Sequence, residues 1–134
     1  AERYSLKHHN PLVQVFGVSP AASPVMYESV RANKILEMET YPTLADTCAG
    51  NMDLDTITLA PCTEHVEEIF LLSEEEIEAA IRLLFEEHRL VVEGSGALSV
   101  GGLLKHRERF EGKKVVATVC GRNVDLEVFK RIIQ

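Results

Sequence analysis

Short, continuous apolar runs mark the expected strands of this chain. The first, Leu12–Val18 (LVQVFGV), is rich in β-branched residues and is closed by a Ser-Pro turn. Two similar runs are Glu68–Leu72 and Lys113–Cys120 (KKVVATVC), and the latter carries basic residues only at its entry. Runs of this length, apolar on both faces, are typical of buried parallel strands.

Helical spacing is clearest after Ser73. Ser73 is followed three residues later by Glu76, the pattern of a capping box, and Glu74, Glu75 and Glu76 would lie at the positive end of the helix dipole. The apolar residues Ile77, Ile81, Leu84 and Phe85 then recur with helical periodicity. A helix is therefore predicted directly after the second strand.

Caps and prolines predict the other helices. Residues 1–9 should form a short helix that ends before Pro11, and Ser23 should cap a helix over residues 23–33 with Pro24 in its first position. A third helix is predicted within Leu90–Leu104, after a Gly-Ser-Gly turn, and its middle should be closely packed. A fourth is predicted over Val124–Ile133, capped by Asn123. Residues 36–63 should be loops with one short helix.

The alternation of strands and helices predicts an α/β fold. Strands separated by helices of about 10 to 15 residues form right-handed βαβ units around a parallel sheet, here a three-layer domain. The length of 134 residues fits one domain, residues 1–134. Ligands of such sheets bind beyond the carboxyl ends of the strands, and Gly121 follows the end of the last predicted strand.

Composition narrows the function classes. The formal net charge is −7, so no basic surface for nucleic acid is expected. Because no apolar run reaches the roughly 20 residues that cross a bilayer, and the N-terminus lacks a signal-peptide core, we expect a cytoplasmic protein without a membrane partner. Cys48, Cys62 and Cys120 lack the close spacings of zinc or redox sites and are expected to be free thiols.

Five motifs in a fixed order resemble one enzyme family. VQVFGVSP, PTLAD, VEEIFLLSEEEIEAAIRLL, RLVVEGSGA and KKVVATVCGRNVDL cover nearly the whole chain. In this order they resemble the second half of the serine/threonine dehydratases, which are fold-type II pyridoxal-phosphate enzymes of the tryptophan synthase beta-like family. The resemblance implies the large-domain fold of these enzymes, the cofactor pyridoxal 5'-phosphate and an amino-acid substrate.

The resemblance also implies cofactor-binding residues, namely Cys120, Gly121, Glu93 and Asp46. Cys120 matches the position that faces the pyridine nitrogen, where a neutral thiol does not hold the nitrogen protonated as a carboxylate would. Glu93 is implied to lie in the active-site wall and Asp46 in a loop near the cofactor, although Thr47 replaces the family's glycine. The alternatives are a buried structural thiol at Cys120, an acid at a helix N-terminus for Glu93, and a turn-capping Asp46.

No metal site is expected. Some members of the family bind a divalent cation through acidic residues, but this chain has Ser19 and Val25 at the corresponding positions. A hard cation needs several oxygen ligands, which these residues do not supply. His8 and His9 are adjacent, so they should point in different directions on a helix and remain at the surface.

The resemblance finally implies that essential parts lie elsewhere. The family's Schiff-base lysine, in a Ser-x-Lys motif, and its glycine-rich phosphate loop both precede the matched segments. No catalytic residue is therefore expected in this chain, which should be inactive without the N-terminal remainder of the enzyme. An excised fragment is the leading explanation; a split partner and a standalone descendant are the others.

Two functions are compatible with these sequence features. The first is part of an ammonia-lyase that converts L-threonine or L-serine to a 2-oxo acid and ammonia. The second is a non-catalytic amino-acid-binding or subunit-interaction domain that retains the fold. In either case, exposed apolar surface on such a half-enzyme should favour a homo-oligomer.

Overall fold

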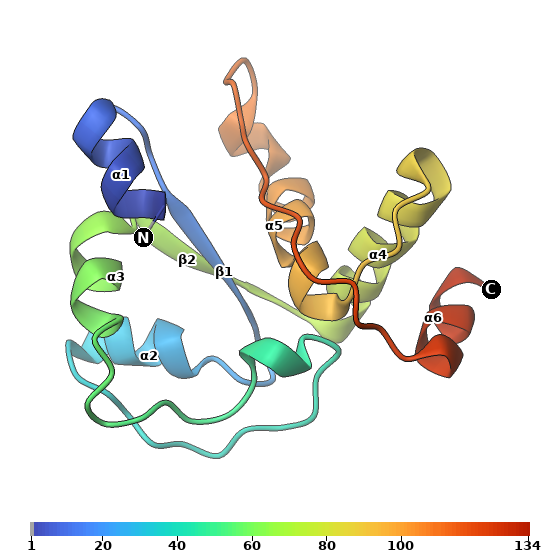
Figure 1. Cartoon of the computed structure of the whole chain (residues 1–134), viewed down its shortest axis with the longest axis horizontal. Coiled ribbons are helices and arrows are strands. Elements are labelled where there is room, and N and C mark those ends of the chain that lie inside the picture. Colours follow the sequence, from blue (N-terminus) through green and yellow to red (C-terminus); the bar gives the residue numbers. More distant parts are fainter. Residues whose placement is uncertain (1) are drawn as a thin grey trace.

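The computed structural model describes residues 2–134, with side chains from Leu6 on, as helices packed on a small parallel sheet. The strands are β1 (Phe16–Pro20) and β2 (Glu68–Leu72). The helices are α1 (Glu2–His9), α2 (Val25–Ala32), η1 (Asp46–Cys48), α3 (Leu59–His65), α4 (Glu74–His88), α5 (Gly94–Lys105), η2 (Arg107–Phe110) and α6 (Leu126–Ile133). In Figure 1, α1, α2 and α3 lie on one side of the strands and α4, α5 and α6 on the other, so the predicted α/β three-layer class is confirmed.

The two strands are parallel, as predicted. Phe16 pairs with Glu68 and the register continues to Pro20 with Leu72, so the prediction for the second strand is confirmed. The first strand begins at Phe16 and not at Leu12, where the apolar run starts. A turn at Asn10 explains the difference, because its side-chain oxygen accepts a hydrogen bond from the Leu12 N–H at 3.1 Å and prevents an extended start.

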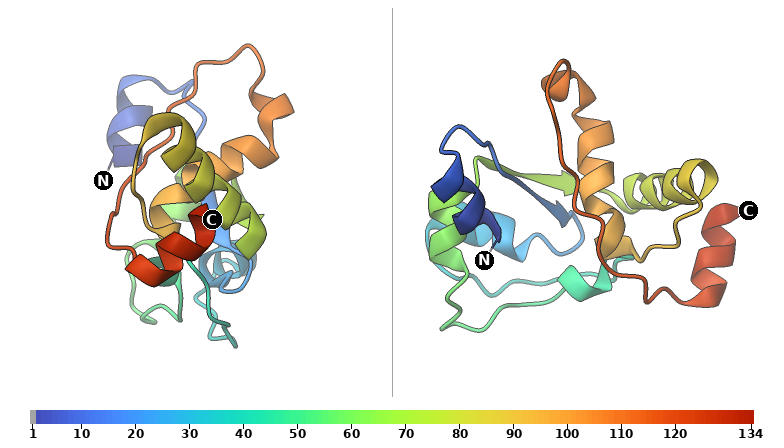
Figure 2. Two further views of the ribbon diagram at one scale, coloured as in Figure 1. Left: turned by 90° about the vertical axis from the view of Figure 1, so that its right-hand side faces the viewer. Right: turned by 45° about the horizontal axis from the view of Figure 1, so that its top comes forward.

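The prediction of a buried strand over Lys113–Cys120 is wrong for this structure. The segment pairs with neither strand, and 93% of Val116 is exposed. It runs beside α5 in both views of Figure 2, and the Ser99 hydroxyl donates to the Thr118 carbonyl at 2.8 Å. Its apolar pattern suits a strand, but a strand also needs a neighbouring backbone edge, which α5 does not offer.

The helix caps agree with the prediction at α4 and differ at α2 and α6. At α4 the Glu76 N–H donates to the Ser73 hydroxyl at 3.4 Å and the Ser73 N–H donates to the Glu76 carboxylate at 2.9 Å, which confirms the capping box. Ser23 does not cap α2, because its hydroxyl accepts from the Gly50 N–H instead. Asp125, not Asn123, caps α6.

The remaining helices need smaller corrections. α1 ends at His9, before Pro11, as predicted, and the loops between α2 and β2 contain α3 and the short η1. The predicted Gly-Ser-Gly turn is wrong, because Gly94 to Gly96 form the first turn of α5. Small residues here serve close packing: a Cβ at Gly102 would lie 2.7 Å from a Val18 methyl carbon.

Helices α4, α5 and α6 form the core together with the end of β2. Leu72, Ile77 and Ile81 are almost completely buried, and α5 packs against both strands and against α4. Ile132 brings α6 onto the same cluster. Burial of these side chains provides the main stabilising free energy of this half of the molecule. The buried cluster includes Val92 just before α5 and Ala97 within it, so it holds the first turn of that helix in place.

The carboxyl group of Glu76 makes stability depend on pH. Burial raises its pKa, but the hydrogen bond from Lys105 at 2.9 Å, the Ser73 N–H and the charge of Lys105 lower it more, so the pKa lies below its ordinary value of 4.5. A carboxyl group with a lowered pKa stabilises the fold above the unfolded-state pKa, and this contribution is lost as the pH falls through the folded-state pKa.

Glu76→Gln should therefore reduce the acid sensitivity of the protein. We expect the free energy of unfolding to fall less between about pH 7 and about pH 3 in this variant than in the wild type. Urea unfolding at the two pH values measures this difference, with Glu87→Gln at an exposed position of α4 as the control. An equal fall in wild type and Glu76→Gln would show that Glu76 has no such role.

Candidate functional site

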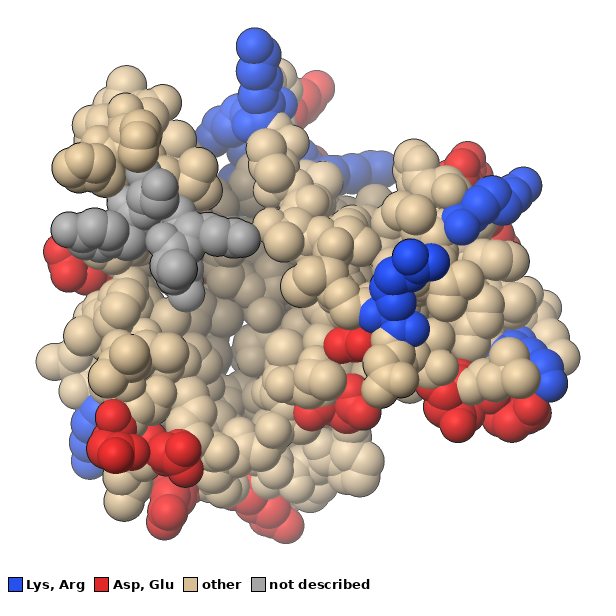
Figure 3. Space-filling view, viewed as in Figure 1, with Lys and Arg blue, Asp and Glu red and all other residues tan. Residues whose placement is uncertain are grey.

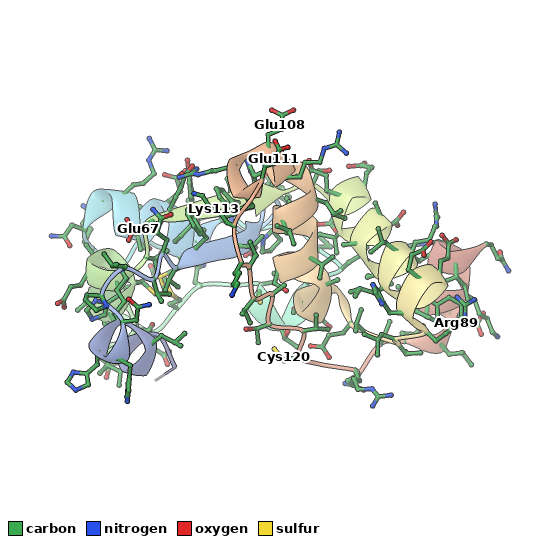
Figure 4. All side chains as sticks on the ribbon, turned by 90° about the horizontal axis from the view of Figure 1, so that it is seen from above. Glu67, Arg89, Glu108, Glu111, Lys113 and Cys120 are labelled. Atoms are coloured by element: carbon green, nitrogen blue, oxygen red, sulfur yellow. The ribbon has the colours of Figure 1, made fainter. Side chains whose placement is uncertain are left out.

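Three distant segments meet at the N-terminal end of α5. They are the turn that contains η1, the start of α5 after Glu93, and the segment that follows Cys120 (Figure 1). Seen from above, Cys120 lies at the outer edge of the molecule beside this end of the helix, whereas Lys113 lies towards the other end of α5 (Figure 4). The site is therefore assembled by tertiary contacts around one helix terminus.

Two glycines allow the backbones to approach this closely. A Cβ at Gly94 would lie 2.0 Å from the carbonyl oxygen of Leu44, and a Cβ at Gly96 would lie 2.2 Å from that of Cys120. Real Cβ atoms do not approach carbonyl oxygens to these distances, so larger residues would push the segments apart. The first turn of α5 is a contact surface for both neighbouring loops.

The side chain of Glu93 lies at the centre of the site. Glu93 is 8% exposed, and its carboxylate accepts hydrogen bonds from the Thr47 hydroxyl at 3.2 Å and from the Asn123 N–H at 2.9 Å. Its own N–H donates to the Gly121 carbonyl at 3.2 Å. These bonds satisfy a carboxylate whose burial would otherwise be costly. Glu93 thus connects both loops to α5.

The backbone of Gly121 lies against Glu93. Its φ of 94° lies in the left-handed region, and a Cβ there would lie 2.4 Å from the carboxyl carbon of Glu93. A side chain at this position would be both strained and in collision with Glu93. Two structural features therefore favour glycine at position 121: the left-handed backbone and the close approach of Glu93.

The structure brings three of the four predicted site residues into direct proximity. Cys120 and Gly121 are continuous in the chain, and Gly121 contacts Glu93. Cys120 is exposed, so the alternative of a buried structural thiol is wrong for this structure. Glu93 is the N-cap residue of α5 but makes no side-chain cap, because its carboxylate is used by the two loops.

Asp46 has a more local role in this structure. It is exposed on η1, and its carboxylate accepts from the Thr47 N–H at 2.8 Å, in agreement with the turn-capping alternative. Its place beside Thr47 nevertheless puts it on the same turn as a partner of Glu93. A cofactor contact by Asp46 remains a prediction.

Sequence reasoning missed two partners of Glu93. In the sequence, Thr47 stands out only as a replacement for glycine, and Asn123 only as an expected helix cap. They are 46 and 30 residues away from Glu93, and no local pattern signals contacts at such separations. Ser95, in the first turn of α5, also has a buried hydroxyl oxygen without a hydrogen-bond partner.

Positions outside this site show no metal-binding geometry. Ser19 and Val25 are buried, and among the side chains that the structure describes, from Leu6 to Gln134, no group of three or more His, Cys, Asp or Glu is arranged to hold a metal ion. His8 and His9 are exposed and lie edge-to-face with each other. Over the same residues, no helix is both long and apolar enough to span a membrane.

Residues 4–121 match the family described as pyridoxal-phosphate dependent enzyme, and the chain belongs to this family. It is 36% identical over 129 residues to an L-threonine ammonia-lyase of Thermotoga maritima, covering 96% of this chain and 32% of that protein. An L-threo-3-hydroxyaspartate ammonia-lyase of Saccharomyces cerevisiae is 32% identical over 124 residues, covering 92% of this chain and 38% of that protein. The chain thus spans about a third of the length of these curated relatives.

The fold comparison agrees with the family. Threonine deaminase isoform 2 of Solanum lycopersicum superposes with a TM-score of 0.88 and 26% identity, covering 97% of this chain and 38% of that chain. A serine racemase of Dictyostelium discoideum superposes with a TM-score of 0.82, 26% identity and coverage of 93% of this chain and 40% of that one. The expected fold-type II architecture is therefore confirmed.

The residues at the start of α5 fit one end of pyridoxal 5'-phosphate. An exposed thiol at Cys120, followed by a glycine, is a small polar group of the kind that can lie against the ring nitrogen of the cofactor. The unpartnered hydroxyl of Ser95 is a further polar group in this region. Among the described residues, Lys7, Lys105 and Lys130 are held in ion pairs with Glu67, Glu76 and Glu127. The fit of Cys120 and Gly121 concerns the ring nitrogen of the cofactor.

Proposed function

We propose that residues 1–134 are the C-terminal portion of the catalytic domain of a pyridoxal-phosphate dependent ammonia-lyase. The observation that supports this best is the convergence of Cys120, Gly121 and Glu93 at the start of α5. These residues belong to segments that resemble the dehydratases, and their proximity at the start of α5 supports a shared role. A domain that had retained only the fold would have no need of an exposed thiol next to Gly121, which contacts Glu93.

Each residue of the site has a proposed role. When bound, the cofactor supplies an electron sink for the removal of the substrate's α-proton and β-hydroxyl. Cys120 would face its ring nitrogen, and Gly121 would let the backbone pass closely beside Glu93. Glu93 would form part of the site wall, and Asp46 would lie on the neighbouring turn. The Schiff-base lysine and the phosphate loop would come from the N-terminal remainder.

The proposed substrates are L-threonine and L-serine, with a 2-oxo acid and ammonia as products. Two of the relatives bear the names of ammonia-lyases for L-threonine and L-threo-3-hydroxyaspartate. These amino acids share a β-hydroxyl and differ in the group beyond it. A single methyl group changes binding by only about 1–3 kcal/mol, so the preferred substrate depends on pocket contacts that include the remainder of the enzyme.

The proposed partner is the N-terminal remainder of the same enzyme. The face seen in Figure 3 is hollowed between the part that carries α1 to α3 and the part that carries α5 and the segment before Cys120. That segment exposes Val115, Val116 and Val119, and among residues 2–134 the sheet consists of β1 paired with β2. Exposed apolar side chains and an unpaired strand edge are both features that suit the packing of further polypeptide. We also propose a cytoplasmic homo-oligomer.

The chain alone should be inactive, and the complete protein active. We expect no 2-oxobutanoate from L-threonine when residues 1–134 are incubated with pyridoxal 5'-phosphate, because the lysine is supplied by the remainder. Turnover should appear when the N-terminal remainder is present, either joined to residues 1–134 in one chain or added as a separate fragment. A coupled assay for 2-oxobutanoate measures both, with L-alanine, which lacks the β-hydroxyl, as the control substrate.

Two outcomes would contradict this proposal. Turnover by residues 1–134 alone would place the essential lysine within this chain. A complete protein that binds the cofactor and L-threonine without turnover would favour the second function, a non-catalytic amino-acid-binding domain. Binding of the amino acid without binding of the cofactor would also favour a non-catalytic amino-acid-binding domain.

A further inference from the structure

We propose that Thr47 is a positioning residue that holds the Glu93 carboxylate, and through it the segment that carries Cys120. Its meaning for catalysis depends on the proposed function, but the contact itself does not. Thr47 is exposed on η1, yet its hydroxyl reaches the buried carboxylate of Glu93. This contact would make the turn that contains η1 a part of the site rather than a loop beside it.

The two oxygens of Glu93 are bound by two different segments. Oε1 accepts from Thr47 Oγ1 at 3.2 Å, and Oε2 accepts from the Asn123 N–H at 2.9 Å. A carboxylate held at both oxygens cannot rotate without losing a hydrogen bond. Glu93 is therefore a bridge whose orientation depends on both donors.

Thr47 is well placed to act as a donor because its turn is anchored. Its own N–H is bound by Asp46, and the Cys48 N–H donates to the Ala45 carbonyl at 2.9 Å. Ala45 is completely buried, and the preceding Leu44 carbonyl lies against Gly94. The position of the hydroxyl is thus set by the backbone of η1.

Loss of this hydroxyl should loosen the Cys120 segment. With one donor gone, Glu93 would keep only the Asn123 N–H at its buried carboxylate and could rotate towards solvent. Asn123 follows Cys120 by three residues, and the Gly121 carbonyl is bound by the Glu93 backbone. A change at Thr47 would therefore be transmitted to the Cys120 segment through Glu93.

Amide hydrogen exchange tests this inference without cofactor or substrate. In Thr47→Val, which keeps the shape and removes the hydroxyl, we expect the Asn123 amide to exchange about fivefold faster than in the wild type, the effect of one ordinary hydrogen bond. Thr47→Ser retains a hydroxyl and should restore the wild-type rate. The His106 amide, which donates to the Gly102 carbonyl at the C-terminal end of α5, serves as an internal control and should not change.

The outcomes separate positioning from general stability. Unchanged exchange at Asn123 in Thr47→Val, or faster exchange at Asn123 and His106 alike, would overturn the inference. So would a failure of Thr47→Ser to restore the rate. In the complete protein, Thr47→Val should also lower kcat/KM for L-threonine and Thr47→Ser should recover it. An inactive complete protein would contradict the proposed function. Amide exchange needs no turnover, so the exchange rate of Asn123 would still decide whether Thr47 positions Glu93.

Discussion

Gly96→Ala should displace the Cys120 segment from α5. The new Cβ would lie 2.2 Å from the Cys120 carbonyl oxygen and 2.9 Å from that of Gly121, and neither backbone oxygen can move by a simple rotamer change. Overpacking typically costs about 1–3 kcal/mol. The better helix propensity of alanine offsets only about 1 kcal/mol of this. We therefore expect a net loss of stability of up to about 2 kcal/mol.

The displacement should be visible at one backbone hydrogen bond. The Glu93 N–H donates to the Gly121 carbonyl at 3.2 Å, so its amide should exchange faster in Gly96→Ala. Gly101→Ala on the same helix is the matched control. Its added Cβ would meet a side-chain methyl carbon of Leu72 at 2.5 Å, away from the site. It should change stability without changing exchange at Glu93. Wild-type exchange and stability in Gly96→Ala would refute the close approach of Cys120 to α5.

Leu72→Ala should cause the larger loss of stability. Leu72 is completely buried at the end of β2, and it contacts α5 where Gly101 permits the approach. Truncation of a buried leucine costs about 2–5 kcal/mol, because the lost burial is added to the energy of the cavity. At about 4 °C for each kcal/mol, the Tm should fall by about 8–20 °C.

An exposed leucine provides the control for this experiment. Leu12 is 86% exposed, so Leu12→Ala should change the free energy of unfolding by no more than about 0.5 kcal/mol. Urea and thermal unfolding of both variants measure the difference. Similar losses for Leu72→Ala and Leu12→Ala would mean that the core does not include the end of β2.

The candidate site was only partly predictable. The resemblance of separated motifs indicated Cys120, Gly121 and Glu93, and the structure places them together. It did not indicate that Thr47 and the Asn123 backbone hold the Glu93 carboxylate. Side-chain hydrogen bonds between loops depend on where the loops meet, which is decided by the packing of α5 against its neighbours.

The sequence by itself determined the elements that local interactions stabilise. The capping box from Ser73 to Glu76 closes within four residues, and the apolar positions of α4 then repeat along one face of the helix. Glu68–Leu72 was also predicted with its observed limits, because its five residues are bounded by a helix cap on one side. Contacts between residues so close in the sequence can be predicted from the local pattern of residues.

Only the tertiary structure decided what the Lys113–Cys120 segment and the start of α5 do. The apolar pattern of that segment predicts a strand, but a strand forms only beside another backbone edge, and here the segment lies along α5. Gly94 and Gly96 predict a turn because glycine is common there, whereas the fold uses them within a helix to admit two carbonyl oxygens. In each case the deciding partner lies far away in the chain, so the local pattern could not identify it.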